Sequence, residues 1–335
     1  MDIDVFVAAH TAEWRRLDDL ANRAHRPARL TGNELDELVD LYQRTATHLS
    51  VVRTNSPDPL LVDKLSSLVA RGRSAVAGSK TWSWLTVWTF LQVTFPAAVY
   101  RIRWWVAATG VACFGLSLAL GAWVVLNPEV QANILPPDEV RDLVNEDFEN
   151  YYSEAPAGSF AAKVFTNNVW VAAQALTLGI LLGLPTVYVL FQNFANLGII
   201  GGLMVANDRG ALFFGLITPH GLIELTAVLI AGAAGLKIGW TVIDPGARSR
   251  SQAVAEEFRS LITVTLGLVI VLLVAGLIEG FVTPSGLPTA ARVTIGVIAE
   301  LGLFYWIGVY GRRANKAGIT GDLDEDIRGD VAITV

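Results

Sequence analysis

The chain has 335 residues, of which 53% are hydrophobic and only 17% are charged, and its mean hydropathy is +0.46. This composition is too apolar for an ordinary soluble protein, and the net charge of −6 argues against a nucleic-acid binder. The only cysteine, Cys113, excludes an internal disulfide and a thiol-ligated metal cluster. The first hundred residues are polar, whereas long apolar runs begin at Trp104. We therefore expect an all-α fold, in which a polytopic transmembrane helix bundle follows an N-terminal helical domain.

Residues 1–80 are predicted to form a cytoplasmic helical domain. Apolar residues recur at three- and four-residue steps over 35–49, after a Thr-Gly-Asn start signal at 31–33, and again over 61–68, after a Pro-rich break at 56–59. Two or three packed helices are expected. The acidic start does not have the pattern of a signal peptide, so we expect the first membrane span to target the chain.

Residues 81–103 are predicted to form an aromatic and basic helix. Its aromatic face consists of Trp84, Trp88, Leu91 and Phe95. Because indole and phenyl rings favour the headgroup boundary, we interpret this segment as an interfacial helix, with a buried core helix as the alternative. Arg101 and Arg103 add a basic collar before the first span.

Residues 104–310 are predicted to form the transmembrane bundle, since crossing ~30 Å of hydrocarbon requires about 20 apolar residues. The expected spans are 104–126, 164–190, 194–206, 211–243, 261–283 and 293–310. The third of these is short and rich in glycine, so a re-entrant segment is the alternative to a full crossing. About six spans are expected.

The distribution of charge predicts that both termini are cytoplasmic, because Lys and Arg near span ends stay inside. These residues are Arg101, Arg103, Lys237, Arg248, Arg250, Arg259, Arg312, Arg313 and Lys316. The loop 127–163 is acidic and is expected outside, with a helix over 137–149 that is either simply solvated or binds cations or a partner. Residues 311–335 are expected to form a cytoplasmic tail.

Two amide clusters lie within or beside the apolar segments, and each belongs to the candidate polar site. Asn167 and Asn168 stand at the expected outer start of the second span, where they either line a polar path or cap the helix. Gln192 and Asn193, with Asn196, stand at the expected turn between the second and third spans, where they either line the same path or stabilise the turn.

A third cluster contains the only histidine of the apolar region. Pro219 and Gly221 are expected to kink or restart the helix here, with Thr218 as a cap. His220 and Glu224 are four residues apart, so they share one helix face and lie within reach of each other. The pair is either structural or able to relay protons or bind a cation.

Glycine spacing predicts close helix packing. The motif from Gly179 to Gly183 and the motif from Gly235 to Gly239 both have the small-xxx-small pattern that lets helix backbones approach. Two acidic residues are also notable: Glu279 is expected at the outer surface, whereas Glu300 lies in the middle of a span and needs a partner.

Signatures of enzymes are missing from the sequence. We find no H-E-x-x-H zinc motif, no phosphate-binding loop and no G-x-S-x-G elbow. Only four histidines are present, and three of them precede the apolar region. We therefore expect no catalytic residue, no metal site and no cofactor.

Several spaced motifs resemble those of the stage II sporulation protein M family. They are Asn167-Asn168, the run from Gly179 to Thr186, Gln192-Asn193, the run from Pro219 to Leu225 and the run from Ala231 to Leu236. The family's namesake works with two partner proteins in a membrane complex that remodels septal peptidoglycan. By this resemblance, the chain is expected to be an assembly component and not the wall hydrolase.

The N-terminal region is similar to that of the longer actinobacterial members of this family. Such members are often encoded beside MoxR-type AAA ATPases and proteins with von Willebrand A-like domains, which the resemblance therefore implies as cytoplasmic partners. Membrane lipids and further copies of the chain are other expected partners. The leading hypothesis is a non-enzymatic scaffold of an envelope-remodelling complex in the cell membrane. The alternative is a transporter or channel with a polar path past His220, Glu224 and the Asn cluster.

Overall fold

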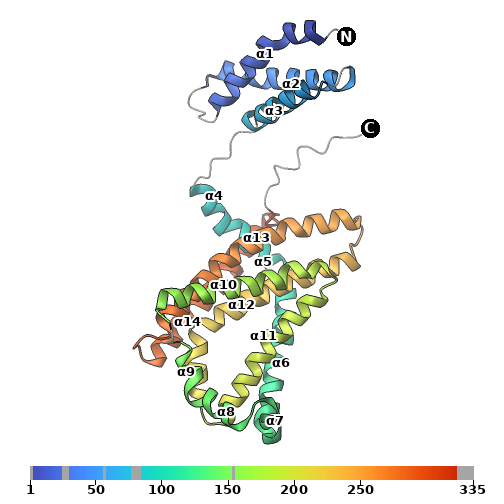
Figure 1. The fold of residues 1–335 in the computed structure, drawn as a ribbon. Helices are drawn as coiled ribbons and strands as arrows, with labels where there is room; N and C mark the ends of the chain where they lie inside the picture. Colours follow the sequence, from blue (N-terminus) through green and yellow to red (C-terminus); the bar gives the residue numbers. More distant parts are fainter. Residues whose placement is uncertain (1–2, 25–29, 56–57, 77–83, 153–154, 323–335) are drawn as a thin grey trace. The chain divides into compact units, whose positions relative to one another are not determined.

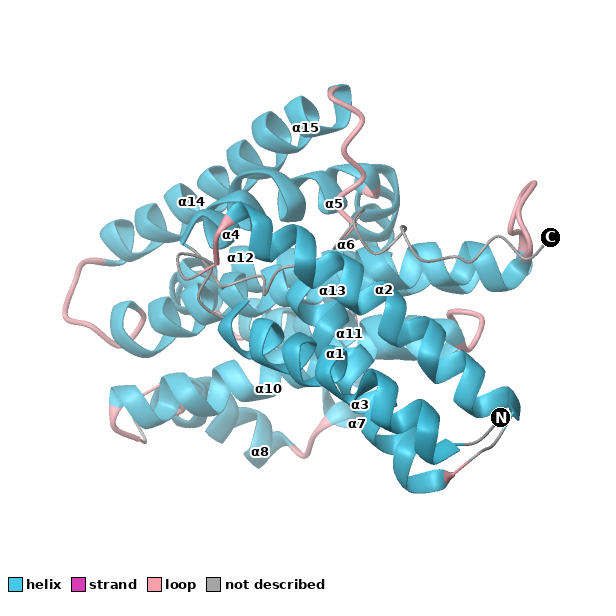
Figure 2. Ribbon diagram, turned by 90° about the horizontal axis from the view of Figure 1, so that it is seen from above, coloured by secondary structure: helices cyan, strands magenta, loops and turns pink. Residues whose placement is uncertain are grey.

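The computed structural model describes residues 3–24, 30–55, 58–76, 84–152 and 155–322 (Figure 1). These residues form helices joined by short connections, and none of them lies in a β-strand (Figure 2). The predicted all-α fold is confirmed. The chain divides into two compact units, residues 1–83 and residues 84–335.

Some predicted features lie outside the described residues. They are His25, the first half of the break at 56–59, the start of the segment 81–103, the acidic Glu154 and the tail beyond Asp322.

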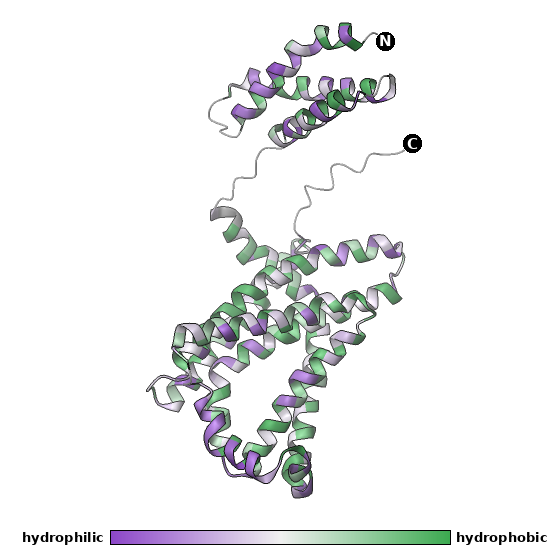
Figure 3. Cartoon of the chain, in the orientation of Figure 1, coloured by the Kyte–Doolittle hydropathy of each residue, from purple (hydrophilic) through white to green (hydrophobic). Residues whose placement is uncertain are grey.

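The N-terminal unit consists of three helices around a core of its own. They are α1 (Ile3–Ala24), α2 (Gly32–Asn55) and α3 (Pro59–Val76). The core residues include Trp14, Leu17, Leu20, Leu38, Val52, Leu65 and Leu68. The amphipathic spacing in the sequence thus did predict packed helices. Figure 3 shows the same pattern as alternating polar and apolar residues along each helix.

A capping box starts α2 at the predicted position. The Glu34 side chain accepts a hydrogen bond from the Thr31 backbone N–H at 2.8 Å, and the Glu34 backbone N–H donates to the Thr31 hydroxyl at 3.4 Å. The bond from the Thr31 N–H, together with Arg23, lowers the pKa of Glu34 to about 2. The cap fixes where the second helix begins.

The second unit contains the remaining helices. They are α4 (Trp84–Thr89), α5 (Phe95–Arg101), α6 (Arg103–Leu126), α7 (Pro128–Ile134), α8 (Pro137–Asp142), α9 (Phe148–Asn150), α10 (Ala157–Thr177), α11 (Leu184–Ala206), α12 (Gly210–Ile243), α13 (Arg250–Leu277), α14 (Thr289–Tyr305) and α15 (Arg312–Lys316). Wider π-helical turns at Phe90–Thr94, Leu143–Asp147, Ile278–Val282 and Trp306–Gly311, and a 3₁₀ turn at Leu178–Ile180, join several of them.

Five helical stretches in the described part are long and apolar enough to cross a membrane. They are Arg103–Leu126, Leu184–Ala206, Gly210–Ile243, Arg250–Val282 and Thr289–Lys316. The predicted polytopic bundle is confirmed. Five stretches, not the expected six, meet the criteria of length and apolar composition. Helix α10 is the remaining candidate for a sixth span. It has 21 residues and a length of about 32 Å, but it is more polar than the other five stretches because it contains Lys163, Asn167, Asn168 and Gln174.

The predicted boundary between the second and third spans is wrong. The chain turns at 178–183, where Gly183 has a positive φ of 76°, and not near Asn193. A left-handed glycine breaks a helix at little cost, and Pro185 follows it at the start of the next helix. The glycine-rich segment 194–206 is therefore the second half of the full-length α11.

Helix α12 lies at the centre of the bundle and is the most buried of the five spans. Its partners include α6, α10, α11, α13 and α14. The two predicted glycine motifs pack on each other: a Cβ at Gly179 would overlap the carbonyl of Gly235, and a Cβ at Gly239 would lie 2.5 Å from the backbone nitrogen of Gly183. Backbone contact of this kind holds α10 and the start of α11 against α12.

The aromatic segment has two different parts. Trp84 and Trp88 are exposed, as an interfacial helix requires. Phe95, in contrast, is fully buried in the bundle core, where its ring packs against Gly267 of α13 and, with centroids 5.1 Å apart, against Trp306. The segment from Phe95 onward is thus a packed element of the bundle.

Ion pairs cluster at one end of the bundle. Glu257 of α13 accepts from Lys237 of α12 at 2.8 Å and from Arg101 of α5 at 3.2 Å, and Arg101 lies 3.8 Å from Asp322. Gly311 packs against the backbone of Pro96. The basic ends of three segments that are far apart in sequence therefore meet at the same end.

Candidate functional site

Three ionisable side chains converge between α12 and the end of α13. The Nε2 atom of His220 lies 3.7 Å from Oε1 of Glu279, and ligand atoms of His220, Glu224 and Glu279 all lie within 4.8 Å of one another. His220 and Glu279 are each only 4% exposed. Charged groups at such depth are costly unless they are paired or bind something, so the cluster needs a chemical explanation.

Hydrogen bonding fixes which nitrogen of His220 faces the carboxylates. Its Nδ1 atom lies 3.1 Å from the Thr283 hydroxyl, which can itself donate to the backbone carbonyl of Ile278 at 3.4 Å. In that arrangement Thr283 accepts the proton on Nδ1, and the unprotonated Nε2 atom points toward Glu279. A nitrogen lone pair and two carboxylates then face one another, and a proton or a cation between them would satisfy all three.

Two asparagines of α10 complete the cluster on the side of Glu224. Asn168 is buried and forms a side-chain hydrogen bond with Glu224, and the Asn167 amide donates to Oδ1 of Asn168 at 3.3 Å. Neither residue caps α10, which begins ten residues earlier at Ala157. Capping as the alternative explanation for these residues is therefore wrong.

A cavity of about 180 Å³ opens beside His220 and Glu224. Asn193 and Asn196 of α11 form its polar wall, and Phe148 of α9 covers part of it. Within the described residues, the second carboxylate oxygens of Glu224 and Glu279 have no hydrogen-bond partner. A space of this size holds several water molecules, and polar walls favour their entry.

The structure brings some of the predicted site residues to the cavity and leaves others away from it. Asn193 lines the cavity, although its amide also donates to the backbone carbonyl of Val189 at 2.8 Å. Its neighbour Gln192 is exposed and does not line the cavity. Both residues lie in the middle of α11, so the predicted turn at this position is wrong.

Helix α12 continues through Pro219 without a restart, so Thr218 is not a cap. The backbone of Pro219 packs directly against Gly296 of α14. Gly221 lies one residue beyond His220 and lines the cavity with it. Gly296 thus lets α12 and α14 approach each other near the cluster.

Glu279, which we did not assign to the site from the sequence, is a site residue whose side chain is buried at the end of the span Arg250–Val282. It lies in the π-helical turn Ile278–Val282, and the next residue, Gly280, packs against Ala161 of α10. A glutamate followed by a glycine at the end of an apolar span was the available signal. Thr283 and Tyr152 were also missed: Thr283 is four residues beyond Glu279, which was itself not assigned to the site, and Tyr152 is far in sequence from the other site residues.

Tyr152 packs beside the cluster. Its ring centroid lies 5.8 Å from that of His220. Burial, reinforced by the charge of Glu279, raises the pKa of Tyr152 well above its ordinary value. The phenol therefore stays protonated beside the cluster.

Glu300 of α14 has the partner that its position in a span required. The Thr226 hydroxyl donates to Glu300 at 2.6 Å, and both side chains are buried. Thr226 is two residues beyond Glu224, which places this pair on a different face of α12 from the main cluster.

These observations define a multi-span helical membrane protein in which two carboxylates, one buried and one half-buried, lie close to a buried histidine. A family model described as stage II sporulation protein M matches residues 110–284, just over half of the chain. The chain belongs to the stage II sporulation protein M family. The match covers His220, Glu224, Glu279 and the asparagines.

Other comparisons give less functional information. A model described as "Domain of unknown function (DUF8413)" matches residues 4–78, which correspond to the N-terminal unit. An uncharacterized protein of Methanocaldococcus jannaschii is 32% identical over 123 residues, which are 36% of this chain and 69% of that protein. No solved structure matches the chain.

Proposed function

We propose that this protein is a non-enzymatic transport protein that moves protons across the membrane past His220, Glu224 and Glu279. One observation carries the proposal: the Nε2 atom of His220 and two carboxylates converge in the bundle, with their ligand atoms within 4.8 Å of one another. Chains of His and Glu inside membrane bundles are the usual elements of proton relays. A relay needs groups that exchange a proton directly or through one bridging water molecule, and the separations of up to 4.8 Å fit a bridging water.

The cavity supports transport over a purely structural role. Glu224 and His220 face about 180 Å³ of space with Asn193 and Asn196 on the opposite wall. A dry structural contact would fill this volume with apolar side chains. Water in the cavity would connect the cluster to the solvent, as proton transfer requires.

The test is proton flux in liposomes that contain the full-length chain. A potassium diffusion potential drives the flux, and a trapped pH-sensitive dye reports it. We expect flux well above that of protein-free liposomes, and a loss of at least tenfold in Glu279→Gln and Glu224→Gln. Gln192→Ala is the matched control, because this exposed amide lies outside the cluster and should leave the flux unchanged.

Several outcomes would overturn the proposal. Wild-type flux equal to that of protein-free liposomes is one, and full flux in both glutamine variants is another. Zinc uptake without proton flux would assign the same ligands to a metal ion instead. Folded yield, measured by size-exclusion chromatography for every variant, separates loss of flux from loss of structure.

A second candidate function is a scaffold of an envelope-remodelling complex. The observation that favours it is the N-terminal unit, which has its own core and matches a family model separate from that of the membrane unit. MoxR-type AAA ATPases and von Willebrand A-like proteins are the partners we propose for it. Pull-down of these partners by the full chain and by a chain without residues 1–80 tests this function, and equal recovery by both would contradict it.

His220→Ala separates the two candidates. On the transport proposal, the variant assembles and recovers partners normally but loses proton flux. On the scaffold proposal, it lowers folded yield or partner recovery, and wild-type liposomes carry no flux.

We also propose that both termini are cytoplasmic. Arg101 and Lys237 meet at one end of the bundle, where both pair with Glu257. Arg312 follows Gly311, which packs against Pro96 near the same end. By the positive-inside rule, this basic end is the cytoplasmic one. This orientation requires α10 to cross the membrane as a sixth span. Protease protection of tags at each terminus in right-side-out vesicles tests it.

A further inference from the structure

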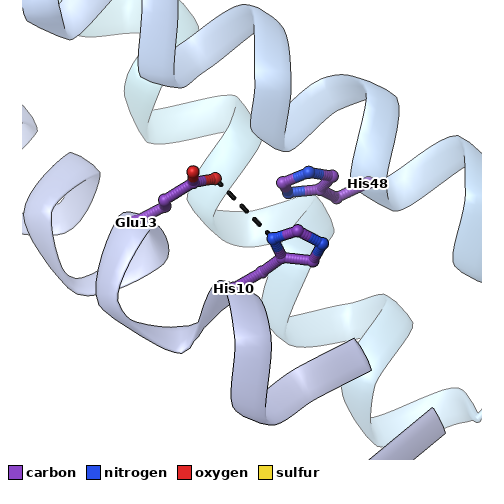
Figure 4. Close-up of side chains that lie close together, drawn as sticks. All are labelled: His10, Glu13 and His48. Carbon is purple, nitrogen blue, oxygen red and sulfur yellow. Dashed lines mark ion pairs between the residues drawn. The ribbon is translucent and has the colours of Figure 1, made fainter. Parts of the chain in front are cut away.

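A second cluster of ligand-type side chains lies in the N-terminal unit, far in sequence from the membrane site. His10 and Glu13 are three residues apart on α1, and His48 reaches them from α2 (Figure 4). One ligand atom from each of the three residues lies within 4.8 Å of the other two. All three are half-buried, so the cluster is held by the fold and is still accessible from solvent.

The carboxylate of Glu13 is only partly satisfied. One oxygen, Oε1, lies 3.6 Å from a guanidinium nitrogen of Arg44. The other, Oε2, is buried without a hydrogen-bond partner among the described residues and lies 3.9 Å from Nδ1 of His10. An unpartnered buried carboxylate oxygen close to an imidazole is an arrangement expected for two ligands of one metal ion.

The two imidazoles lie face to face. Their ring centroids are 4.0 Å apart with an interplanar angle of 24°, and the Trp14 indole donates to Nδ1 of His48 at 3.2 Å. Unprotonated imidazole nitrogens bind metals, and the stacked contact holds the two rings side by side. The indole bond uses the Nδ1 lone pair of His48, so this ring binds a metal ion only when that bond breaks.

Neutral imidazole and carboxylate groups are the ligands that zinc-class transition metals prefer. An H-x-x-E pair on one helix, joined by a histidine of the next helix, resembles the i, i+3 ligand pairs that helix bundles use for metals. Three protein ligands leave a position for water, which the half-exposed location allows.

We propose that His10, Glu13 and His48 bind one divalent transition-metal ion of the zinc class, which links α1 to α2. Binding turns the imidazoles from stacked to converging. It also competes with Arg44 for the Glu13 carboxylate. The proposal concerns the N-terminal unit alone and does not depend on proton transport.

The test is a zinc titration of the chelator-stripped full-length chain in detergent, in competition with a fluorescent zinc indicator. We expect one ion per chain at this site, and a loss of affinity of at least tenfold in His10→Gln, His48→Gln and Glu13→Gln. The matched control is Glu37→Gln, a carboxylate of α2 that pairs with Arg16 outside the cluster and should leave affinity unchanged. Circular dichroism and size-exclusion chromatography confirm that each variant is folded.

Arg44→Gln should change zinc affinity in the direction opposite to that of a folding defect. Removing the competing cation should raise zinc affinity by a few fold. His220→Gln should leave this binding intact, because His220 belongs to the membrane cluster. The proposal is overturned if zinc does not bind, if folded His10→Gln and His48→Gln bind as tightly as wild type, or if His220→Gln alone abolishes binding.

Discussion

Gly239 gives the sharpest test of how the bundle is packed. A Cβ added here would lie 2.5 Å from the backbone nitrogen of Gly183 and 2.7 Å from the carbonyl oxygen of Gly179. Ordinary van der Waals contact begins at 3.4 Å. Gly239→Ala therefore forces α12 away from the turn at 178–183 by about 0.7 to 0.9 Å. Both obstacles are backbone atoms, which no change of rotamer can move.

Two opposing contributions set the expected change in the free energy of unfolding of Gly239→Ala. Overpacking in a close-packed interior costs about 1–3 kcal/mol, and the fixed backbone contacts place Gly239→Ala in the upper part of that range. Alanine is favoured over glycine in a helix by about 1 kcal/mol. We therefore expect a net destabilisation of about 1–2 kcal/mol. The control is Gly302→Ala on α14, where a new Cβ meets nothing within 4 Å. It should stabilise by up to about 1 kcal/mol.

The assay is reversible unfolding of the full-length chain by SDS in mixed micelles, followed by far-ultraviolet circular dichroism. The free energies of unfolding of the two variants should differ by about 2–3 kcal/mol, with wild type between them. Equal stability of Gly239→Ala and Gly302→Ala would refute the backbone contact between α12 and the glycine turn.

Two further predictions concern single hydrogen bonds and titration. Thr226→Val removes the donor to buried Glu300 and should lower stability in the same assay by about 1–3 kcal/mol, whereas Thr241→Val, whose hydroxyl bonds only to a carbonyl of its own helix, should change it by less than about 0.5 kcal/mol. An equal loss in both variants would contradict the first prediction. Burial, followed by the charge of neighbouring His10, lowers the pKa of His48 in the folded state below its ordinary value of 6.5. The folded unit then binds fewer protons than the unfolded chain, so its stability is fully present above about pH 6.5 and falls as the pH drops toward the folded pKa. Urea unfolding of residues 1–83 at pH 7.5 and 5.5 should show this loss, and His48→Gln should reduce it; an unchanged midpoint in the wild-type unit would contradict the reasoning.

Much of the fold was predictable because its signals are local. The step from polar to apolar composition identified the membrane bundle, and the three- and four-residue apolar spacing identified the helices of the N-terminal unit. The motifs at Gly179 and Gly235 predicted close packing, since only glycine permits such an approach. These inferences need the chain's own periodicity and no knowledge of its tertiary contacts.

The wrong boundary between the second and third spans has a physical cause. Gln192 and Asn193 are polar, and a polar pair within an apolar run suggests a turn. The actual turn spans 178–183, where the left-handed Gly183 directly precedes α11 in the middle of an apolar stretch. Hydropathy cannot detect such a break, because the residues on both sides of the turn are apolar.

Only part of the candidate site could be predicted, because some of its contacts depend on how the helices pack. The i, i+4 spacing placed His220 and Glu224 on one face, and the asparagines marked polar positions in neighbouring helices. That Asn168 bonds to Glu224, and that Glu279 faces His220, depends on how three helices pack. Gln192 and Asn193 are adjacent in sequence, and only the orientation of α11 decides that one lines the cavity and the other does not.

The most direct measurement of the central claim is whether water reaches the cavity beside His220 and Glu224. The single native cysteine allows a clean background: Cys113→Ser combined with either Asn193→Cys or Gln192→Cys in the reconstituted chain. A small membrane-impermeant thiol reagent should label Asn193→Cys, which lines the cavity, much faster than Gln192→Cys, which lies on the apolar outer surface of the bundle and does not line the cavity. Equal protection of both positions, or faster labelling of Gln192→Cys, would contradict the account.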